Sequence, residues 1–387
     1  MTDLDRLLDF AERSRLPEGG FGTLGDDGRV LAGRPVETWI VARMTHVFGL
    51  ATLLGRPGAD DLARHGVVAL TEGPLRDAEH GGWRAGTDDD TKAAYVHAFA
   101  MLAGSTAAAA GVEGGAALLD DAVAVWQDRF WDDDAGLAVE EWDRAWTTCA
   151  DYRGINANMH GVEASLAAAD ALAGTAQAAR LRSQALRTTE RAYGWARQRN
   201  WRLPEHFSAD WEPLPDYNRD RPADPFRPFG VTVGHQFEWA RLALHLRATA
   251  TDAPDWLLAD AVALFDAAAT RGWAADGHDG FPYTLDWDDR PVVPARMHWV
   301  LCEAVAAATV LAAVTGKQRF RGLAEQWRDH GEEVFLDPTT GNWHHELTPT
   351  GEVGTGTWTG QPDAYHLAQM LLLYRRPVRG SIAAALR

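Results

Sequence analysis

The chain has 387 residues, of which 46% are hydrophobic and 24% charged, a composition typical of a globular protein with a large core and not of a disordered chain. Its acidic residues outnumber its basic ones by 55 to 37, which gives a formal charge of −18. Nucleic acids and anionic membranes attract basic protein faces, so this charge disfavours both as partners.

Cysteine use and the N-terminus indicate an intracellular protein. The two cysteines, Cys149 and Cys302, are far apart in sequence, too few for a disulfide framework or a cysteine metal cluster. Residues 1–15 are charged and have a helical pattern, unlike a signal peptide. We find no apolar run of the roughly 18 residues that a membrane span needs. We therefore expect the protein to be cytoplasmic.

Along the chain, six amphipathic segments alternate with six apolar segments that each carry a histidine. Each of the first set has apolar residues at three- and four-residue steps and one polar face, which predicts an amphipathic helix. These segments are 3–15, 61–73, 117–131, 178–195, 255–273 and 317–336. Each of the second set carries a histidine followed by a helical stretch that is apolar nearly all round, as buried helices are. The histidines are His46, His97, His160, His235, His298 and His366.

The loops between these helices are rich in Gly, Asp and Trp. Residues 77–90, 132–143, 276–292 and 337–358 have the turn residues and short alternating runs of small hairpins. The histidines recur every 51 to 75 residues, which indicates a repeat architecture. We predict an all-α fold, an (α/α)6 barrel of six helix-hairpin repeats with short β-hairpins in the loops, as a single domain over residues 1–387. The histidines should lie at equivalent heights, near the N-terminal ends of the inner helices.

Histidines in such a ring can carry proton transfer, because the ordinary pKa of an imidazole, about 6.5, suits neutral pH. For His46, His97 and His298 we favour a packing role. Glu238 follows His235 by one helical turn, so both lie on one helical face, where the carboxylate can orient the imidazole or bind a hydroxyl.

Three arginines, Arg43, Arg227 and Arg296, precede histidines in the repeat. Each can hold a sugar hydroxyl or form a structural ion pair. Residues 344–346, His-His-Glu, lie in a loop without a partner at a recognised metal-ligand spacing, so we expect no metal. The sequence has no phosphate loop or dinucleotide fingerprint in a strand-to-helix context and no G-x-S-x-G elbow.

The motifs "ARMTH", "NANMH", "GHQFEW", "RMHW" and "PDAYH" resemble the N-acylglucosamine 2-epimerase superfamily over residues 10–373, above all its aldose–ketose isomerase branch. The resemblance implies an (α/α)6 barrel and a proton transfer through a cis-enediol without metal or cofactor. It implies that His235 and His366 are the acid–base pair. It further implies a substrate site made of Arg43, Tyr95, Met159, His160, Arg227, Glu238 and Trp299.

We therefore expect an isomerase that interconverts D-mannose and D-fructose, with a monosaccharide as its partner, acting as a monomer or homodimer. Alternatives are a 2-epimerase of mannose, cellobiose or an N-acylhexosamine, and a sulfoquinovose isomerase. A glycoside hydrolase would need two carboxylates about 6.5–9.5 Å apart, whereas the repeat supplies histidines. A sugar- or protein-binding toroid without catalysis is the remaining alternative.

Overall fold

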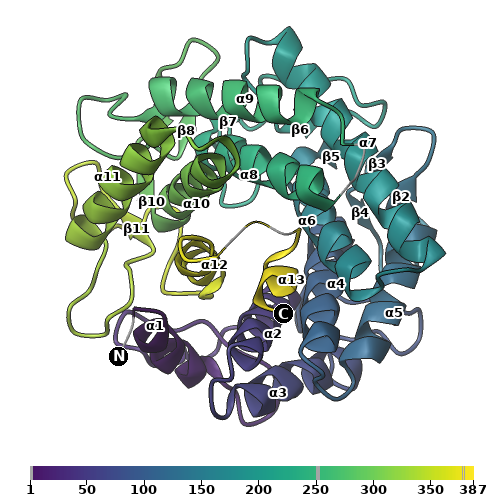
Figure 1. Cartoon of the computed structure of the whole chain (residues 1–387). Helices are drawn as coiled ribbons and strands as arrows, with labels where there is room; N and C mark the ends of the chain where they lie inside the picture. The colour runs from purple at the N-terminus through teal and green to yellow at the C-terminus, as the bar shows by residue number, and fades with distance from the viewer. Residues whose placement is uncertain (1–2, 250–252, 377, 379) are drawn as a thin grey trace. The chain divides into compact units, whose positions relative to one another are not determined.

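The structure, a computed structural model, describes residues 3–249, 253–376, 378 and 380–387. Figure 1 labels its helices and strands along the chain, and these elements fall into two compact units. The N-terminal unit comprises Ala11–Arg191, Pro362–Tyr365 and Arg379–Arg387. The C-terminal unit comprises Ala192–Gln361, Met1–Phe10 and His366–Val378. The single domain expected over residues 1–387 stays a prediction.

The N-terminal unit is built on helices α2, α4 and α6, which are buried along most of their length because apolar residues are spread around each helix. Their few polar side chains, such as Arg43 and His160, are buried as well. Helix α2 packs against α3 and α4, and α4 packs against α5 and α6. Helices α3 and α5 bury one face each. The helices are α2 (Thr38–Leu53), α3 (Ala59–Thr71), α4 (Ala94–Ala109), α5 (Gly115–Val125), α6 (Ile155–Ala171), most of α7 (Ala176–Gln198) and α13 (Ile382–Leu386), with a 3-10 turn at Glu12–Ser14 and a π turn at Trp126–Phe130.

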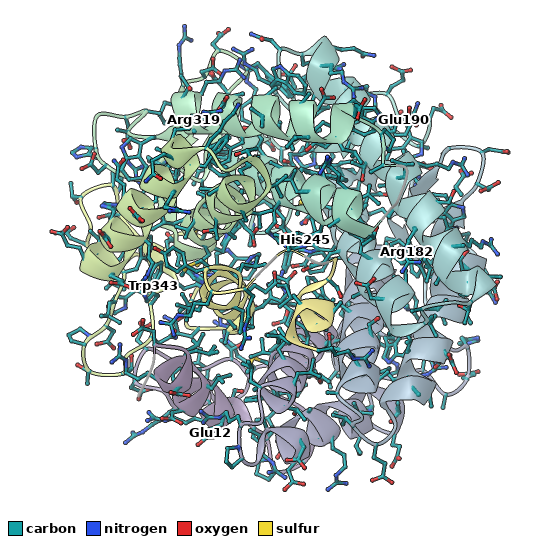
Figure 2. All side chains as sticks on the ribbon, viewed as in Figure 1. Glu12, Arg182, Glu190, His245, Arg319 and Trp343 are labelled. Carbon is teal, nitrogen blue, oxygen red and sulfur yellow. The ribbon has the colours of Figure 1, made fainter. Side chains whose placement is uncertain are left out.

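The C-terminal unit repeats this arrangement. Helices α8 and α10 are buried and pack against each other, while α9 covers α8 and α11 covers α10. Figure 2 labels His245 on the buried helix α8 and Arg319 on the more polar α11. The helices are α8 (Val233–Thr249), α9 (Trp256–Gly272), α10 (His298–Thr315), α11 (Gln318–Val334), most of α12 (Tyr365–Leu373) and most of α1 (Asp3–Ala11).

The strands are two or three residues long and lie in the loops between helices. Within the N-terminal unit β1 pairs with β4 and β2 with β3; within the C-terminal unit β7, β8 and β9 form a sheet and β10 pairs with β11, all antiparallel. The strands are β1 (Lys92–Ala93), β2 (Trp131–Asp132), β3 (Leu137–Ala138), β4 (Glu141–Trp142), β5 (Arg153–Gly154), β6 (His206–Phe207), β7 (Val231–Thr232), β8 (Thr284–Leu285), β9 (Pro291–Val293), β10 (Arg296–Met297) and β11 (Glu346–Leu347).

The alternation of helices agrees with the sequence. All twelve predicted segments contain a helix, and hairpins form in residues 132–143 and 276–292. The loop at 77–90 contains only isolated bridges in the described chain, and β11 bridges Val353 through Leu347. The turn residues correctly predicted that the chain reverses direction in these two loops. The flanking segments pair through single bridges and do not form longer hairpin strands.

Contrary to our expectation, the six histidines do not all lie near the N-terminal ends of the inner helices, and their equal height stays a prediction. His298 is the first residue of α10 and His366 the second of α12, whereas His46 lies near the middle of α2. We aligned the six repeats on their histidines, and this alignment does not show where each helix begins. The loop before each helix sets its first residue.

Helix α10 needs a correction of the membrane analysis. Its 18 residues have a mean hydropathy of 1.6, so by length and composition it could cross a membrane. However, 72% of it is buried within the protein. A core helix of small apolar residues gives the same signal, and the packing of α10 between α8 and α11 accounts for it.

Candidate active site

His235 is held at the start of α8 by the sheet before it. Strand β7 pairs with β8, and Gly230 enters β7 with a φ of +96°. A Cβ at Gly230 would lie 2.2 Å from the carbonyl oxygen of Leu285, so both the backbone angle and the close approach require glycine. This fixes the point where α8 begins, and with it His235, which is 7% exposed.

The imidazole of His235 has a carboxylate partner. Its Nδ1 lies 3.0 Å from Oε2 of Glu205. An ionised carboxylate only accepts hydrogen bonds, so Nδ1–H donates, and Nε2 is left as the nitrogen that can exchange a proton with a ligand. The carboxylate that orients His235 is thus Glu205. The helical spacing had suggested Glu238 for this role. A substrate-binding role for Glu238 stays a prediction.

His366 belongs to a longer chain of buried charges. Its Nδ1 lies 2.9 Å from Oε1 of Glu303, and the other oxygen of Glu303 accepts a hydrogen bond of 2.8 Å from Nε of Arg241. Nη2 of Arg241 donates to Oε1 of Glu238 over 3.2 Å. Arg241 and Glu238 are fully buried. One guanidinium therefore faces two carboxylates, one of which orients a histidine.

The same residues bring three metal-type ligands together. Ligand atoms of Glu238, Glu303 and His366 lie within 4.8 Å of one another, a donor set that could hold a divalent cation. Arg241, however, already bonds both carboxylates and supplies a positive charge to them. Chemistry without metal or cofactor stays a prediction that this pairing favours.

Trp299 lies against both predicted catalytic histidines. The ring centroid of its indole is 5.3 Å from that of His235 and 5.4 Å from that of His366, with interplanar angles of 37° and 34°. A Cβ on Gly234 would lie 2.3 Å from Cζ3 of Trp299, so the indole occupies this place only because residue 234 has no side chain. The structure thus brings together His235, His366 and Trp299.

In the N-terminal unit, Arg43 is the centre of a second cluster. Its Nη1 donates to Asp363 over 3.0 Å and its Nη2 to the hydroxyl of Tyr95 over 2.9 Å. The rings of Phe99 and Tyr365 lie 4.3 and 4.6 Å from its Cζ. Burial opposes its charge, but interactions with Tyr95, Asp363 and Tyr365 outweigh this cost and raise the pKa of Arg43. Arg43 is therefore a fixed, buried cation.

His160 lies beside this cluster. Its ring centroid is 4.5 Å from that of Phe99 and 5.3 Å from that of Tyr95, and its Nδ1 is 3.5 Å from the carboxylate of Glu163. Tyr365 donates a hydrogen bond to the same carboxylate. The neighbouring Met159 is fully buried. The structure thus brings the predicted residues Arg43, Tyr95 and His160 into one cluster, and their role in binding stays a prediction.

The remaining histidines bond to the scaffold, as a packing role requires. Nδ1 of His46 lies 2.7 Å from Thr106 Oγ1 and Nδ1 of His298 lies 3.2 Å from the His345 carbonyl. Burial lowers the pKa of His46 to about 4. His97 donates from Nδ1 to the Ala93 carbonyl and accepts at Nε2 from the Trp83 N–H. Burial lowers its pKa to about 3.

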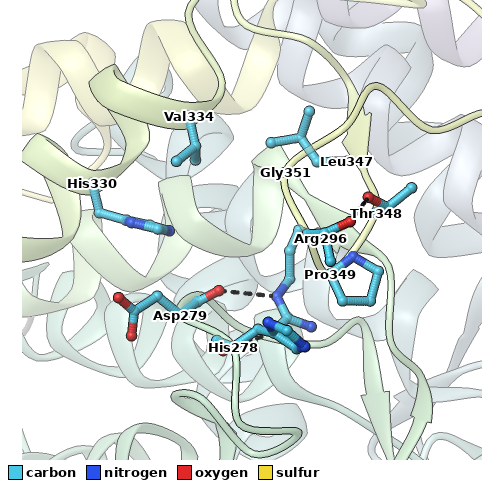
Figure 3. A pocket seen from close by; sticks show the side chains of 10 residues that line it. His278, Asp279, Arg296, His330, Val334, Leu347, Thr348, Pro349 and Gly351 are labelled. Atoms are coloured by element: carbon cyan, nitrogen blue, oxygen red, sulfur yellow. Dashed lines mark hydrogen bonds between the residues drawn. The ribbon is translucent and has the colours of Figure 1, made fainter.

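Arg296 is a structural ion pair. Its Nη1 and Nη2 bond the carboxylate of Asp276 over 2.9 and 2.6 Å. It lines a pocket of about 200 Å³ with His278, Asp279 and His330 (Figure 3). Arg227 lies half-buried in the loop before β7, where its backbone N–H donates to Asp224; its predicted contact with substrate is untested.

Sequence analysis missed Glu205, Glu303, Arg241 and Glu163. Glu303 had a usable signal, since it is the one charged side chain in the apolar helix α10, and a buried charge needs a partner. Glu205 had none, because it lies in an irregular segment without periodicity.

Comparison with known proteins identifies the family of the chain. The family model described as N-acylglucosamine 2-epimerase (GlcNAc 2-epimerase) matches residues 19–370. The chain is similar to a D-mannose isomerase of Thermobifida fusca, with 50% identity over 98% of this chain and 94% of that protein. It is also similar to a D-mannose isomerase of Pseudomonas cannabina pv. alisalensis, with 46% identity over 98% and 93% of the two chains.

A solved structure shares the fold. The crystal structure of a D-mannose isomerase aligns with a TM-score of 0.87 at 26% identity and covers 96% of both chains. This similarity confirms the (α/α)6 barrel as the fold class. With the family model matching most of its length, the chain belongs to the N-acylglucosamine 2-epimerase family.

Proposed function

We propose that this protein is an aldose–ketose isomerase that interconverts D-mannose and D-fructose. The relatives of highest identity described above are named D-mannose isomerases and are aligned over nearly their full length. The observation that carries the proposal is the pair His235 and His366, each bonded to its own carboxylate and each against the indole of Trp299. The two imidazoles can act as base and acid in proton transfer, and the indole between them can bind the sugar.

The proposed reaction uses these groups in order. The indole of Trp299 offers an apolar face to the C–H groups of the open-chain sugar. One imidazole removes the proton from C2, and the electron pair moves to give a cis-enediol as O1 takes up a proton. Delivery of a proton to C1, with loss of the proton from O2, gives the ketose. The carboxylates of Glu205 and Glu303 stabilise the imidazolium formed at each step, because opposite charges lie within hydrogen-bond distance.

The alternatives differ in where the proton returns. Return to the opposite face of C2 gives the epimer, so a 2-epimerase would use the same residues. A glycoside hydrolase needs two carboxyl groups free to act on the sugar. In the C-terminal unit, Glu303 and Glu238 share Arg241 and Glu205 bonds His235, which disfavours hydrolysis. A sulfonated hexose is a further substrate to be tested.

The test is a proton NMR time course in D2O with purified protein and D-mannose. We expect fructose to appear, and deuterium at its C1 would show exchange of the transferred proton with solvent. Glucose without fructose would make the protein a 2-epimerase. No product from mannose, cellobiose, N-acetylmannosamine or sulfoquinovose would contradict catalysis and favour a binding protein. His278→Asn, at an exposed position, is the matched control for active-site histidine variants.

We also propose a cytoplasmic enzyme that works as a monomer or homodimer. The acidic composition and the two isolated cysteines support this location. Light scattering coupled to size exclusion, at concentrations spanning a hundredfold range, measures the oligomeric state, and a mass above that of two chains would contradict the proposal.

A further inference from the structure

We propose that Glu205 is a positioning residue for catalysis, whose carboxylate holds His235 in the tautomer and orientation that proton transfer requires. This inference rests on the proposed function, since it assumes that His235 exchanges protons with a sugar. Glu205 does not lie in any of the motifs that carry the family resemblance. The argument for it comes from its geometry alone.

Both partners of the hydrogen bond are held in place. Glu205 is 4% exposed and His235 7% exposed, and their Oε2 and Nδ1 atoms are 3.0 Å apart. Beside them, Gln236 donates a hydrogen bond of 2.5 Å to the carbonyl oxygen of Trp201. His206, which follows Glu205, bonds the carbonyl oxygen of Pro228 over 2.7 Å. The segment 201–206 is therefore fastened both to α8 and to the loop that precedes it.

Glu205 forms its ion pair with one partner, although its charge also acts on the neighbouring His206. Among the residues that the structure describes, its carboxylate forms an ion pair with His235 alone, and its buried Oε1 has no hydrogen-bond partner. Glu303, by contrast, divides its charge between His366 and Arg241. The two histidines thus have different counter-charges. The loss of the Glu205 charge would act on His235 directly, whereas the loss of Glu303 would also leave Arg241 without one of its partners.

The hydrogen bond also fixes the tautomer. A carboxylate cannot donate, so the neutral ring keeps its proton on Nδ1 and presents the lone pair of Nε2. A glutamine has nearly the same size but can turn its NH2 group toward Nδ1, which would move the ring proton to Nε2. In serine proteases with a Ser-His-Asp triad, the same exchange of carboxylate for amide gives the wrong tautomer and a large loss of kcat.

The first experiment compares Glu205→Gln with Glu212→Gln, a matched control at an exposed position of the same loop. We expect kcat for mannose to fall about 10–100-fold in Glu205→Gln, by analogy with the loss seen when the carboxylate partner of a metal-ligating histidine is removed, with KM within about twofold because no sugar contact is lost. The control should match the wild type. A change in KM alone would overturn the proposal.

A double-variant cycle separates positioning from general support of the fold. If Glu205 acts through His235, adding Glu205→Gln to His235→Asn causes no further loss of kcat. Multiplied losses would overturn the proposal. Glu205→Asp, which keeps the charge, should retain more activity than Glu205→Gln. If it does not, the charge is not what matters.

A measurement without substrate distinguishes failure of this inference from failure of the proposed function. In ¹⁵N-histidine-labelled protein, the strongly deshielded Nδ1–H proton of His235 should be present in the wild type and in Glu212→Gln, lost in Glu205→Gln and absent in His235→Asn. An Nδ1–H signal unaffected by Glu205→Gln would overturn the proposal. If the signal behaves as expected but mannose is not converted, the hydrogen bond stands and the proposed function fails.

Discussion

Trp299 and Gly234 are in such close contact that one methyl group between them is excluded: a Cβ on residue 234 would lie 2.3 Å from Cζ3 and 2.6 Å from Cη2 of the indole. The ring therefore lies directly on the backbone of α8, beside His235. Its distance to both imidazoles depends on this contact.

We predict that Gly234→Ala lowers kcat/KM about 100-fold, because the added methyl displaces the indole by an ångström or more and misplacement of that size is costly in a catalytic site. Steady-state kinetics with mannose measure the effect. Gly322→Ala is the control, since nothing lies within 4 Å of a Cβ at this position in α11. It should leave kinetics unchanged and stabilise the fold by roughly 0.5–1 kcal/mol. Equal activity of both variants would contradict the role given to the contact.

We predict that His235→Asn and His366→Asn each lower kcat/KM by roughly 10²–10⁴-fold, the usual contribution of a general acid or base. Both are buried in the C-terminal unit and bonded to glutamates, so circular dichroism should verify folding first. The NMR assay of fructose formation measures activity. His278→Asn should behave as wild type, and comparable losses in all three variants would count against specific roles.

Arg241→Met should destabilise the protein by about 3–5 kcal/mol, because it leaves the buried carboxylates of Glu238 and Glu303 without the cation between them. Urea unfolding measures the free energy. The control is Arg319→Met, which removes an exposed ion pair with Asp266 and should cost no more than about 1 kcal/mol. Similar losses in the two variants would mean that the buried pairs contribute no more than surface ones.

The buried histidines predict an acid-sensitive fold. Burial lowers the pKa of His97 to about 3 and that of His46 to about 4, whereas an unfolded histidine titrates near 6.5. Between these values the unfolded chain binds more protons, so stability is complete above about pH 6.5 and is lost as the pH falls toward 3, by at most about 1.4 kcal/mol per pH unit and group.

His97→Gln tests this expectation. The variant keeps an acceptor for the Trp83 N–H but cannot be protonated, so it should be less stable than the wild type at pH 7, with a difference that shrinks as the pH falls to 4. Urea unfolding at pH 7, 5.5 and 4 measures the difference. His278→Gln, at an exposed position, should follow the wild-type pH dependence. A difference for His97→Gln that is independent of pH would contradict the assignment of a neutral buried imidazole.

The sequence predicted the helices well because their signal is local. Periodicity of apolar residues distinguishes α11, with one buried face, from α10, which is buried all round. The position of each histidine along its helix was not predictable in this way. Where α2 or α12 begins depends on the loop before it, and a loop has no periodicity.

Partners of site residues were the hardest part to predict. Glu205 is 30 positions before His235 and Glu303 is 63 before His366, so only the folded chain brings these atoms together. The helical spacing of His235 and Glu238 was real, but Arg241, one turn further, bonds Glu238. Spacing shows which residues share a helical face. It does not show which of the neighbouring residues form a hydrogen bond.

The ion pair between Arg43 and Asp363 has a consequence for biosynthesis, since its partners are 320 positions apart. During translation α2 is made early, and the N-terminal parts of a protein generally fold first. The guanidinium of Arg43 receives its carboxylate only after Asp363 has left the ribosome. Until then a nascent α2 holds a cation that it cannot bury without cost. The buried cluster around Arg43 is therefore completed only after a further 320 residues have been synthesised.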